Sequence, residues 1–532
     1  FPTRRSSDLI EEIKETIVEE VIRYNEYEGL DFEALSSLSD DETIKTLCDY
    51  LATCKATRQN DYTGFFEGKN LIYICAESFS SMAIDEKVTP TLYKMANNGI
   101  VLNNYYNSFR NTTTNGEYAF LTGVWPDVAR KETNMGKITG TMGQSIGKDM
   151  STALGNMFNL FEGIESRGYH NYLGNYYGRN QTLPNMGFTC KFMDDGMKFT
   201  TSWPASDLEM MEQSIDDYIN DERFCTYYMT FSGHGNYTTN NIMVARNIKT
   251  VTALADRYLS ESAIGYLSAN YELEKAMTYL LERLEEAGRL EDTVIVLTGD
   301  HYPYYLTDYG YKVLRDEDVD EDFGSFKSTC IIYNSDIKEK IEVDTPCCNV
   351  DILPSILNLF GIPYDSRLYA GTDIFGNGTH IAQIYNRNFV TDKVKYNAST
   401  GKAEWLIVTE NYDSERLDTY LVTYDILSNG NASISGSFFG AKVTTRNGKD
   451  EIQMKPSENS GSPADSNEAA PAQQEEKNPQ SDPEETGEPD DQNSSTENTE
   501  ESGSSGQTGS SSSGGNQRSR SAGSASFARS AG

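Results

Sequence analysis

Short runs of consecutive apolar residues recur along the first two thirds of the chain. Residues 70–76 read Asn-Leu-Ile-Tyr-Ile-Cys-Ala and residues 293–298 read Thr-Val-Ile-Val-Leu-Thr, with further apolar runs at 100–106 and 226–231. Runs of this length, without polar alternation, are typical of strands that are buried on both faces of a sheet. Because such strands occur mainly in parallel sheets, the pattern predicts an α/β fold.

Helical patterns lie between these strands. Residues 272–287 place apolar side chains three and four positions apart, and Gly288 follows as a C-terminal stop. Residues 89–98 begin with Thr-Pro, and residues 350–359 form a third, strongly apolar helical pattern. Strands that alternate with helices predict a sheet covered by helices, with ligand sites at the carboxyl ends of the strands.

The two ends of the chain differ from this central part, which we assign to residues 62–382. Residues 10–61 carry amphipathic helical patterns and predict a helical arm or linker, whereas residues 1–9 resemble translated adapter sequence and are expected to be an artefact. Residues 383–456 are rich in Thr, Tyr, Val and Asn-Gly turns and predict a β-rich C-terminal part of the same unit. Residues 457–532 are almost entirely Ser, Gly, Pro and acidic residues, which predicts a disordered acidic tail.

The charge of the chain excludes some classes of partner. Lys and Arg total 45 against 81 Asp and Glu, which gives a formal net charge of −36. A nucleic acid backbone requires a basic footprint on its protein partner, so we expect no nucleic-acid partner. The chain has no run of 18 apolar residues, so we expect no membrane span within it.

Residues with metal-binding chemistry are few. The eight cysteines form no Cys-x-x-Cys pair, and Cys75 and Cys225 lie in apolar strand patterns, so we expect buried thiols rather than a zinc site or a disulfide framework. Histidine occurs only four times, and a single histidine is more often structural than functional. We interpret His380, which lies in a glycine-rich turn, as structural.

Ionisable residues follow several of the predicted strands directly. Glu77 follows the run at 70–76, and Asp300 and His301 follow the run at 293–298 after one glycine. Two carboxylates and an imidazole are suitable ligands for Mn²⁺, Mg²⁺ or Zn²⁺, and such a cation lowers the pKa of a bound hydroxyl enough to make it a nucleophile. Each piece also has an ordinary interpretation, because an acid at a strand end is often a helix cap and an Asp-His pair occurs by chance.

Seven segments, in their order and spacing, carry a resemblance to a known family. They are 68–78 (GKNLIYICAES), 89–106 (TPTLYKMANNGIVLNNYY), 112–120 (TTTNGEYAF), 170–180 (HNYLGNYYGRN), 230–237 (TFSGHGNY), 293–301 (TVIVLTGDH) and 351–361 (DILPSILNLFG). Residues 62–397 resemble the extracellular catalytic domain of lipoteichoic acid synthases, within the alkaline phosphatase/sulfatase superfamily. The resemblance implies an α/β fold with a mixed sheet flanked by helices.

The resemblance also implies a metal site and a nucleophile. Glu77, Asp300 and His301 align with metal ligands of the family, and Thr113 aligns with the threonine that both binds the metal and attacks the substrate. One divalent cation is implied, with Mn²⁺ as the expected ion and Mg²⁺ or Zn²⁺ as alternatives.

Four further residues match substrate-site positions of the family. Arg179 resembles the arginine that grips the substrate phosphate, and His170 aligns with another substrate-site histidine. His234 resembles the histidine that faces the phosphate and the leaving group, which makes it the candidate general acid. Tyr177 stands where better-known synthases carry Trp, so an aromatic wall is kept while the head-group preference is open.

The implied reaction is a metal-dependent glycerolphosphate transfer. Phosphatidylglycerol would donate a glycerolphosphoryl group to Thr113, and a polyglycerolphosphate chain or a glycolipid acceptor would then take it. Such an enzyme is expected to act as a monomer at a membrane surface, on the extracellular face of a bacterial cell membrane. We expect its N-terminal transmembrane region to be missing from this chain.

Three other interpretations stay open, and a fourth, a sulfatase, is excluded by its missing motif. A phosphoethanolamine transferase and a phosphodiesterase or phosphatase of the same superfamily also use threonine, although the former usually carries several disulfides and more site histidines. A sulfatase would need a Cys or Ser in a Cys/Ser-x-Pro-x-Arg motif, which is not found in the sequence. The alternative from another class is a non-catalytic cell-wall binding homologue.

Overall fold

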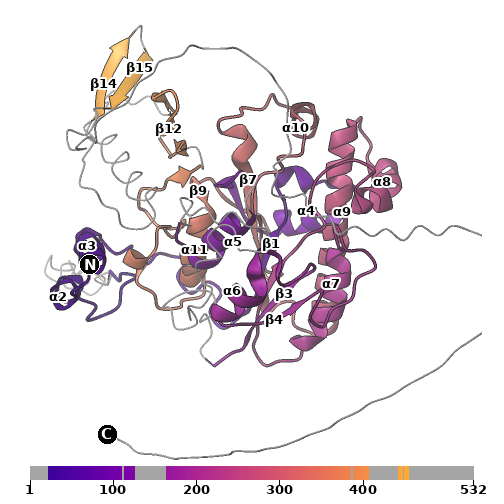
Figure 1. Cartoon of the computed structure of the whole chain (residues 1–532), viewed down its shortest axis with the longest axis horizontal. Coiled ribbons are helices and arrows are strands. Elements are labelled where there is room, and N and C mark those ends of the chain that lie inside the picture. Colours follow the sequence, from indigo (N-terminus) through magenta and orange to yellow (C-terminus); the bar gives the residue numbers. More distant parts are fainter. Residues whose placement is uncertain are drawn as a thin grey trace, which may run out of the picture. The chain divides into compact units, whose positions relative to one another are not determined.

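A nine-stranded mixed sheet forms the centre of the protein (Figure 1). The computed structural model describes residues 22–110, 113–125, 163–384 and 387–406, together with the backbone of 441–446 and 449–454. The strand order is β4-β3-β5-β1-β6-β7-β2-β8, and β9 also pairs with β2. The strands are β1 (Asn70–Ala76), β2 (Gly99–Tyr106), β3 (Ser166–His170), β4 (Phe188–Phe192), β5 (Cys225–Met229), β6 (Thr293–Gly299), β7 (Lys327–Tyr333), β8 (Ile341–Val343) and β9 (Cys347–Cys348).

One strand makes the sheet mixed rather than parallel. The neighbours from β4 to β6 pair in parallel, whereas β7 runs antiparallel to both β6 and β2. Because β7 reverses direction between them, the carboxyl end of β2 lies at the same edge of the sheet as those of β1, β3, β5 and β6. The predicted mixed α/β sheet is therefore confirmed.

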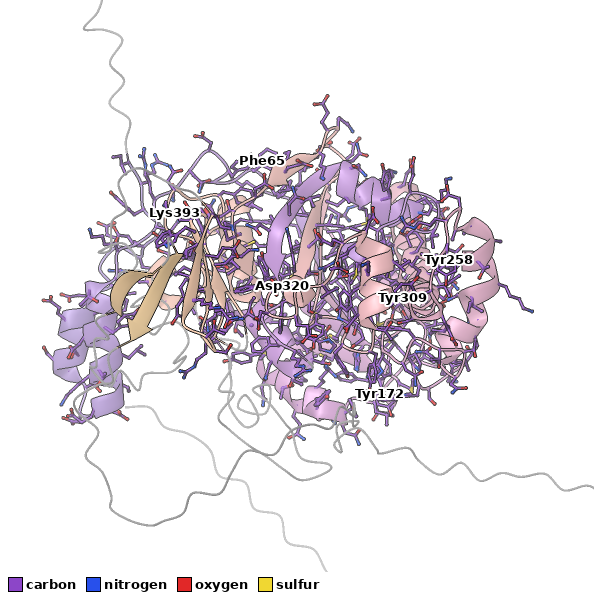
Figure 2. All side chains as sticks on the ribbon, turned by 90° about the horizontal axis from the view of Figure 1, so that it is seen from above. Phe65, Tyr172, Tyr258, Tyr309, Asp320 and Lys393 are labelled. Atoms are coloured by element: carbon purple, nitrogen blue, oxygen red, sulfur yellow. The ribbon has the colours of Figure 1, made fainter. Side chains whose placement is uncertain are left out.

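Helices cover both faces of the sheet, and β1 shows why. All seven residues of β1 are buried, and its side chains alternate between two cores. Leu71 and Tyr73 belong to the core that includes α5, α6 and α11, whereas Ile72 and Ile74 belong to the core that includes α4, α7 and α9 (Figure 1). Side chains fill the space between the sheet and the helices (Figure 2). The helices of this unit are α4 (Pro90–Asn97), α5 (Thr113–Thr122), α6 (Arg179–Asn185), α7 (Asp207–Ser214), α8 (Ile242–Leu254), α9 (Glu261–Glu286), α10 (Asp308–Arg315) and α11 (Asn349–Leu359).

Two of the predicted boundaries were wrong. Helix α9 begins at Glu261, eleven residues before the predicted start, with the Ser260 side chain accepting a hydrogen bond from Ala263 N as the N-cap. Its first turns are buried but contain small and polar residues, so they lack the apolar periodicity that a helix prediction needs. Strand β5 ends at Met229, two residues before the predicted end, which leaves the segment up to His234 as a loop.

The N-terminal arm contains two short helices, α2 (Phe32–Leu38) and α3 (Glu42–Thr53). The buried Phe32 ring lies 4.6 Å from the guanidinium carbon of Arg367, and Asn25 Nδ2 donates to Tyr364 Oη over 3.1 Å. The arm is thus attached to the chain that follows α11. The sequence also predicts a helix over residues 10–24, of which residues 10–21 lie outside the described residues, while residues 22–24 are not helical.

A second, six-stranded sheet of antiparallel strands follows, in the order β10-β11-β12-β13-β15-β14. Its strands are β10 (Ala382–Gln383), β11 (Phe389–Val390), β12 (Val394–Asn397), β13 (Lys402–Trp405), β14 (Ala441–Arg446) and β15 (Lys449–Met454). This sheet confirms that the C-terminal part is β-rich, while residues 1–9 and 457–532 lie outside the described part of the chain.

Two further findings concern the whole described chain. All eight cysteines are free and six of them are buried, as the apolar patterns around them indicate. Among the described residues, no helix combines the length and the apolar character that crossing a bilayer requires.

Candidate active site

The register of the sheet brings Glu77 and Asp300 together. Ala76, the last residue of β1, pairs with Gly299, the last residue of β6, in a parallel ladder. The next residue on each strand is a carboxylate, so the two acids leave neighbouring strands at the same level. Ser78 N donates to Asp300 Oδ1 over 2.9 Å across this junction.

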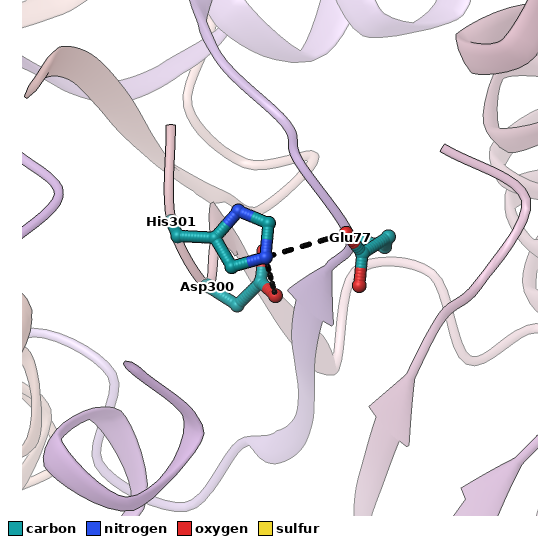
Figure 3. A group of neighbouring side chains, drawn as sticks. All are labelled: Glu77, Asp300 and His301. Carbon is teal, nitrogen blue, oxygen red and sulfur yellow. Dashed lines mark ion pairs between the residues drawn. The ribbon is translucent and has the colours of Figure 1, made fainter. Parts of the chain in front are cut away.

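Four residues that the sequence analysis singled out converge at this point. His301 Nε2 lies 3.1 Å from Asp300 Oδ2 and 3.5 Å from Glu77 Oε1, as Figure 3 shows. Thr113 Oγ1 lies 3.5 Å from Glu77 Oε2 and 3.4 Å from His301 Nε2. All four side chains are buried. We call Glu77, Asp300 and His301 with the Thr113 hydroxyl the acidic cluster.

Thr113 reaches the acidic cluster because α5 packs unusually close to the end of β6. Thr113 is the first residue of α5, and Gly116 follows three residues later in the first turn of the helix. A Cβ atom on Gly116 would stand 1.9 Å from the backbone oxygen of Asp300. Only a glycine permits this approach, so Gly116 is what lets the helix present its N-terminal hydroxyl to the carboxylates.

The hydrogen bonds around the acidic cluster leave ligand atoms facing one another. His301 Nδ1 donates to Tyr302 O over 3.0 Å, so Nε2 is the ring nitrogen that faces the two carboxylates. The buried Asp300 Oδ2 accepts no hydrogen bond from the described residues, although His301 Nε2 lies 3.1 Å from it. Carboxylate oxygens of Glu77 and Asp300 and a ring nitrogen of His301 all lie within 4.8 Å of one another. This donor set fits a divalent cation.

The electrostatics of Glu77 agree with a site that requires a cation. Burial, and then the negative charge of Asp300, raise the pKa of Glu77 to about 7, while His301 and His234 lower it. A divalent cation between the two carboxylates would offset both unfavourable contributions. The electrostatics of these two side chains are therefore compatible with a bound divalent cation.

A second buried group surrounds Arg179, the first residue of α6. Its Nη2 and Nε donate to Glu117 Oε2 over 2.9 and 3.0 Å, and its Nη1 lies 3.2 Å from His170 Nε2. His170 Nδ1 lies 3.0 Å from Met229 O, so Nδ1 carries the proton and Nε2 accepts from the guanidinium. Burial, and then the Arg179 charge, hold the pKa of His170 well below its usual range. His170 is therefore neutral.

The acidic cluster and the buried group around Arg179 lie close to one another. The thiol of Cys75 has its pKa raised by burial and then by Asp300, Glu117 and Glu77, while Arg179 lowers it. This single buried side chain on β1 therefore lies within electrostatic reach of both groups. Glu117 had no role in the sequence analysis, although its position four residues after Thr113 was the available signal.

His234 lies among aromatic side chains at the end of β5. Its ring centroid is 5.2 Å from that of Trp203 and 5.3 Å from that of Phe231. The loop that carries it is held by the buried Asp207, whose Oδ1 accepts from Phe231 N over 2.9 Å. Tyr177 has a left-handed backbone, with φ of 56°, and its ring centroid lies 5.3 Å from the guanidinium carbon of Arg179. An aromatic side chain thus adjoins Arg179.

Comparison with known proteins identifies the family. The model of the Sulfatase family matches residues 69–362, which include β1, β6 and every residue of both buried groups. The chain belongs to the sulfatase family. The alkaline phosphatase/sulfatase assignment made from the motifs is therefore confirmed.

Individual relatives are distant. The lipoteichoic acid synthase of Staphylococcus aureus is 23% identical over 397 residues, which cover 71% of this chain and 59% of that protein. This chain therefore spans little more than half the length of that relative. The crystal structure of the lipoteichoic acid synthase LtaP from Listeria monocytogenes has the same fold, with a TM-score of 0.56 and 19% identity over 73% of this chain and 97% of that one.

Proposed function

We propose that this sulfatase-family chain is a phosphotransferase that moves glycerolphosphate from phosphatidylglycerol to a growing lipoteichoic acid chain. One observation carries the proposal. The Thr113 hydroxyl lies 3.4 Å from His301 Nε2 and 3.5 Å from Glu77 Oε2, at a donor set that fits a divalent cation. The relatives named lipoteichoic acid synthase support the choice of substrate.

The chemistry follows from a hydroxyl placed among these groups. Mn²⁺, or Mg²⁺ or Zn²⁺ in its place, held by Glu77, Asp300 and His301, would lower the pKa of a nearby hydroxyl and offset charge on phosphoryl oxygens. Thr113 Oγ1 forms a bond to the phosphorus as the bond to the diacylglycerol oxygen breaks. His234 gives that oxygen its proton.

The second step returns the enzyme to its starting state. His234, which gave up its proton in the first step, takes the proton of the terminal hydroxyl of a polyglycerolphosphate or glycolipid acceptor as that oxygen bonds to the phosphorus. The bond to Thr113 Oγ1 breaks and leaves the Thr113 oxygen deprotonated, as it was before the first attack. Arg179 and His170 would hold the phosphate and Tyr177 would flank the head group. On this proposal the protein works as a monomer at a membrane surface, on the extracellular face of a bacterial cell membrane.

The test compares two substitutions at the nucleophile. With phosphatidylglycerol vesicles and Mn²⁺, we expect Thr113→Ala to abolish diacylglycerol release and Thr113→Ser to keep a measurable part of it, because serine retains the hydroxyl. The control is Thr252→Ala, a threonine exposed on α8, which should match the parent protein. Equal release by the parent and Thr113→Ala would refute the proposed nucleophile.

The same assay separates the alternative functions. Ethanolamine phosphate transfer from phosphatidylethanolamine, without phosphatidylglycerol turnover, would favour the phosphoethanolamine transferase. Release of free glycerol phosphate at a rate that does not depend on acceptor would favour a phosphodiesterase. Binding of either lipid without turnover would favour the non-catalytic homologue.

A further inference from the structure

We propose that Glu117 is a positioning residue that sets the charge preference of the phosphate site: by neutralising Arg179, it makes the site favour singly charged phosphodiesters over doubly charged phosphomonoesters. The inference rests on the proposed function, because it takes Arg179 to be the residue that meets the substrate phosphate.

The Glu117 carboxylate is buried and forms an ion pair with Arg179. Glu117 is fully buried and Arg179 is 1% exposed. Three donor–acceptor pairs join them, with Nε contacting both carboxylate oxygens at 3.2 and 3.0 Å and Nη2 contacting Oε2 at 2.9 Å. Tyr227 Oη donates to Glu117 Oε1 over 3.0 Å. Glu117 contacts the Nε and Nη2 edge of the planar guanidinium and His170 contacts Nη1, and together they fix its orientation.

This pair also fixes Arg179 relative to the nucleophile. Thr113 and Glu117 lie four residues apart on α5, so their side chains share one face of the helix about one turn apart. Gly116 presses the same turn against the backbone of Asp300. Helix α5, in which all ten residues are buried, therefore places the threonine hydroxyl and the carboxylate that binds the guanidinium about one turn apart.

The charges of the site then balance. Arg179 and Glu117 cancel, and His170 is neutral because its Nε2 accepts from the guanidinium. A divalent cation would likewise balance the carboxylates of Glu77 and Asp300. These two groups together carry no net charge, so they gain little from the second negative charge of a monoester, which must still be removed from water. A phosphodiester carries only one charge, which makes it the better fit.

Binding of two small probes tests this without turnover. In a Thr113→Ala background with saturating Mn²⁺ at pH 7.5, calorimetry compares glycerol 3-phosphate, a monoester, with glycerophosphoglycerol, a diester. Glu117→Gln uncovers the charge of Arg179, so we expect the ratio of monoester to diester affinity to rise at least tenfold. Glu117→Asp keeps the charge and shortens the side chain, so both affinities should fall together with their ratio unchanged.

A matched control and a measurement on the unsubstituted Glu117 complete the design. Glu274→Gln alters another buried glutamate, which accepts from Thr91 N and Leu92 N at the start of α4, and should leave the ratio unchanged. If Glu117→Gln does not fold, the pH dependence of binding by the Thr113→Ala protein, which keeps Glu117, still tests the inference. The second phosphate ionisation lies near pH 6, so a site that binds only the doubly charged form would gain about tenfold between pH 5.0 and 7.5. We expect the monoester to gain less than about threefold relative to the diester over this range.

The outcomes separate this inference from the proposed reaction. An unchanged ratio in folded Glu117→Gln, or a tenfold monoester gain with pH in the background protein, would overturn the role of Glu117 even if phosphatidylglycerol is turned over. A shifted ratio without turnover would uphold Glu117 and remove only the proposed reaction. Failure of both probes to bind would overturn the inference, because Arg179 would then not meet phosphate.

Discussion

Adding one methyl group at Gly116 should move the Thr113 hydroxyl away from the other three residues of the acidic cluster. In Gly116→Ala the new Cβ would stand 1.9 Å from Asp300 O, and real Cβ contacts essentially never fall below 3.0 Å. The obstacle is a backbone atom of a packed strand end, which a side-chain rotation cannot relieve. Helix α5 must therefore move by about 1 Å away from β6, and Thr113 must move with it.

The size of the effect follows from this displacement. A misplacement of about 1 Å at a reacting group costs on the order of 100-fold in rate, which is about 2.7 kcal/mol of activation free energy. Overpacking costs about 1–3 kcal/mol of stability, while alanine is better than glycine in a helix by about 1 kcal/mol. The net loss in free energy of unfolding should thus be about 0–2 kcal/mol, smaller than the loss of about 2.7 kcal/mol in activation free energy.

The assay is kcat/KM for diacylglycerol release, with Mn²⁺ affinity by calorimetry as a measurement that does not need turnover. Both should fall in Gly116→Ala. The control is Gly378→Ala, because a Cβ there meets no atom within 4 Å, and it should behave like the parent. Parental activity and Mn²⁺ affinity in Gly116→Ala would refute the argument that this glycine sets the distance between α5 and the carboxylates.

Two further predictions concern buried carboxylates. Glu77→Gln removes one charged ligand while keeping the shape, so Mn²⁺ affinity measured by calorimetry should fall at least about 100-fold; an unchanged affinity would exclude Glu77 as a ligand. Burial raises the pKa of Asp373 from 3.8 to about 7, so the folded state holds this proton more tightly and loses stability as pH rises from about 4 through 7. In urea unfolding between pH 5 and 8, Asp373→Asn should flatten that decline, and an identical slope in both proteins would contradict it.

The sequence predicted those parts of the fold whose residues carry a periodic signal. The strands β1 and β6 are apolar runs with clear ends, and their observed bounds lie within one residue of the predicted ones. Helix α5 was not predicted, because Thr, Asn and Gly at its start are poor helix formers. Burial of all ten residues, rather than propensity, stabilises it.

The candidate site was predictable where carboxylates directly follow strands. Glu77 and Asp300 are such residues, since parallel strands that pair must deliver their next residues to one edge. The pairing of Glu117 with Arg179 was not predictable, because the two are 62 residues apart and depend on how α5 and α6 pack on the sheet. A single sequence carries no local signal for a contact of that kind.

The bond between Ser78 N and Asp300 Oδ1 joins residues that are 222 positions apart in the chain. During synthesis, therefore, Glu77 and Thr113 are made well before Asp300 and His301, and most of the family domain lies between them. Until β6 pairs with β1, an incoming cation meets Glu77 and Thr113 without Asp300 or His301. Contacts this distant also slow folding, because the intervening chain must be closed into a loop first. On the proposed cation site, cation uptake would then be a late event that reports the pairing of β6 with β1, and it would add stability only to chains in which the two strands have paired.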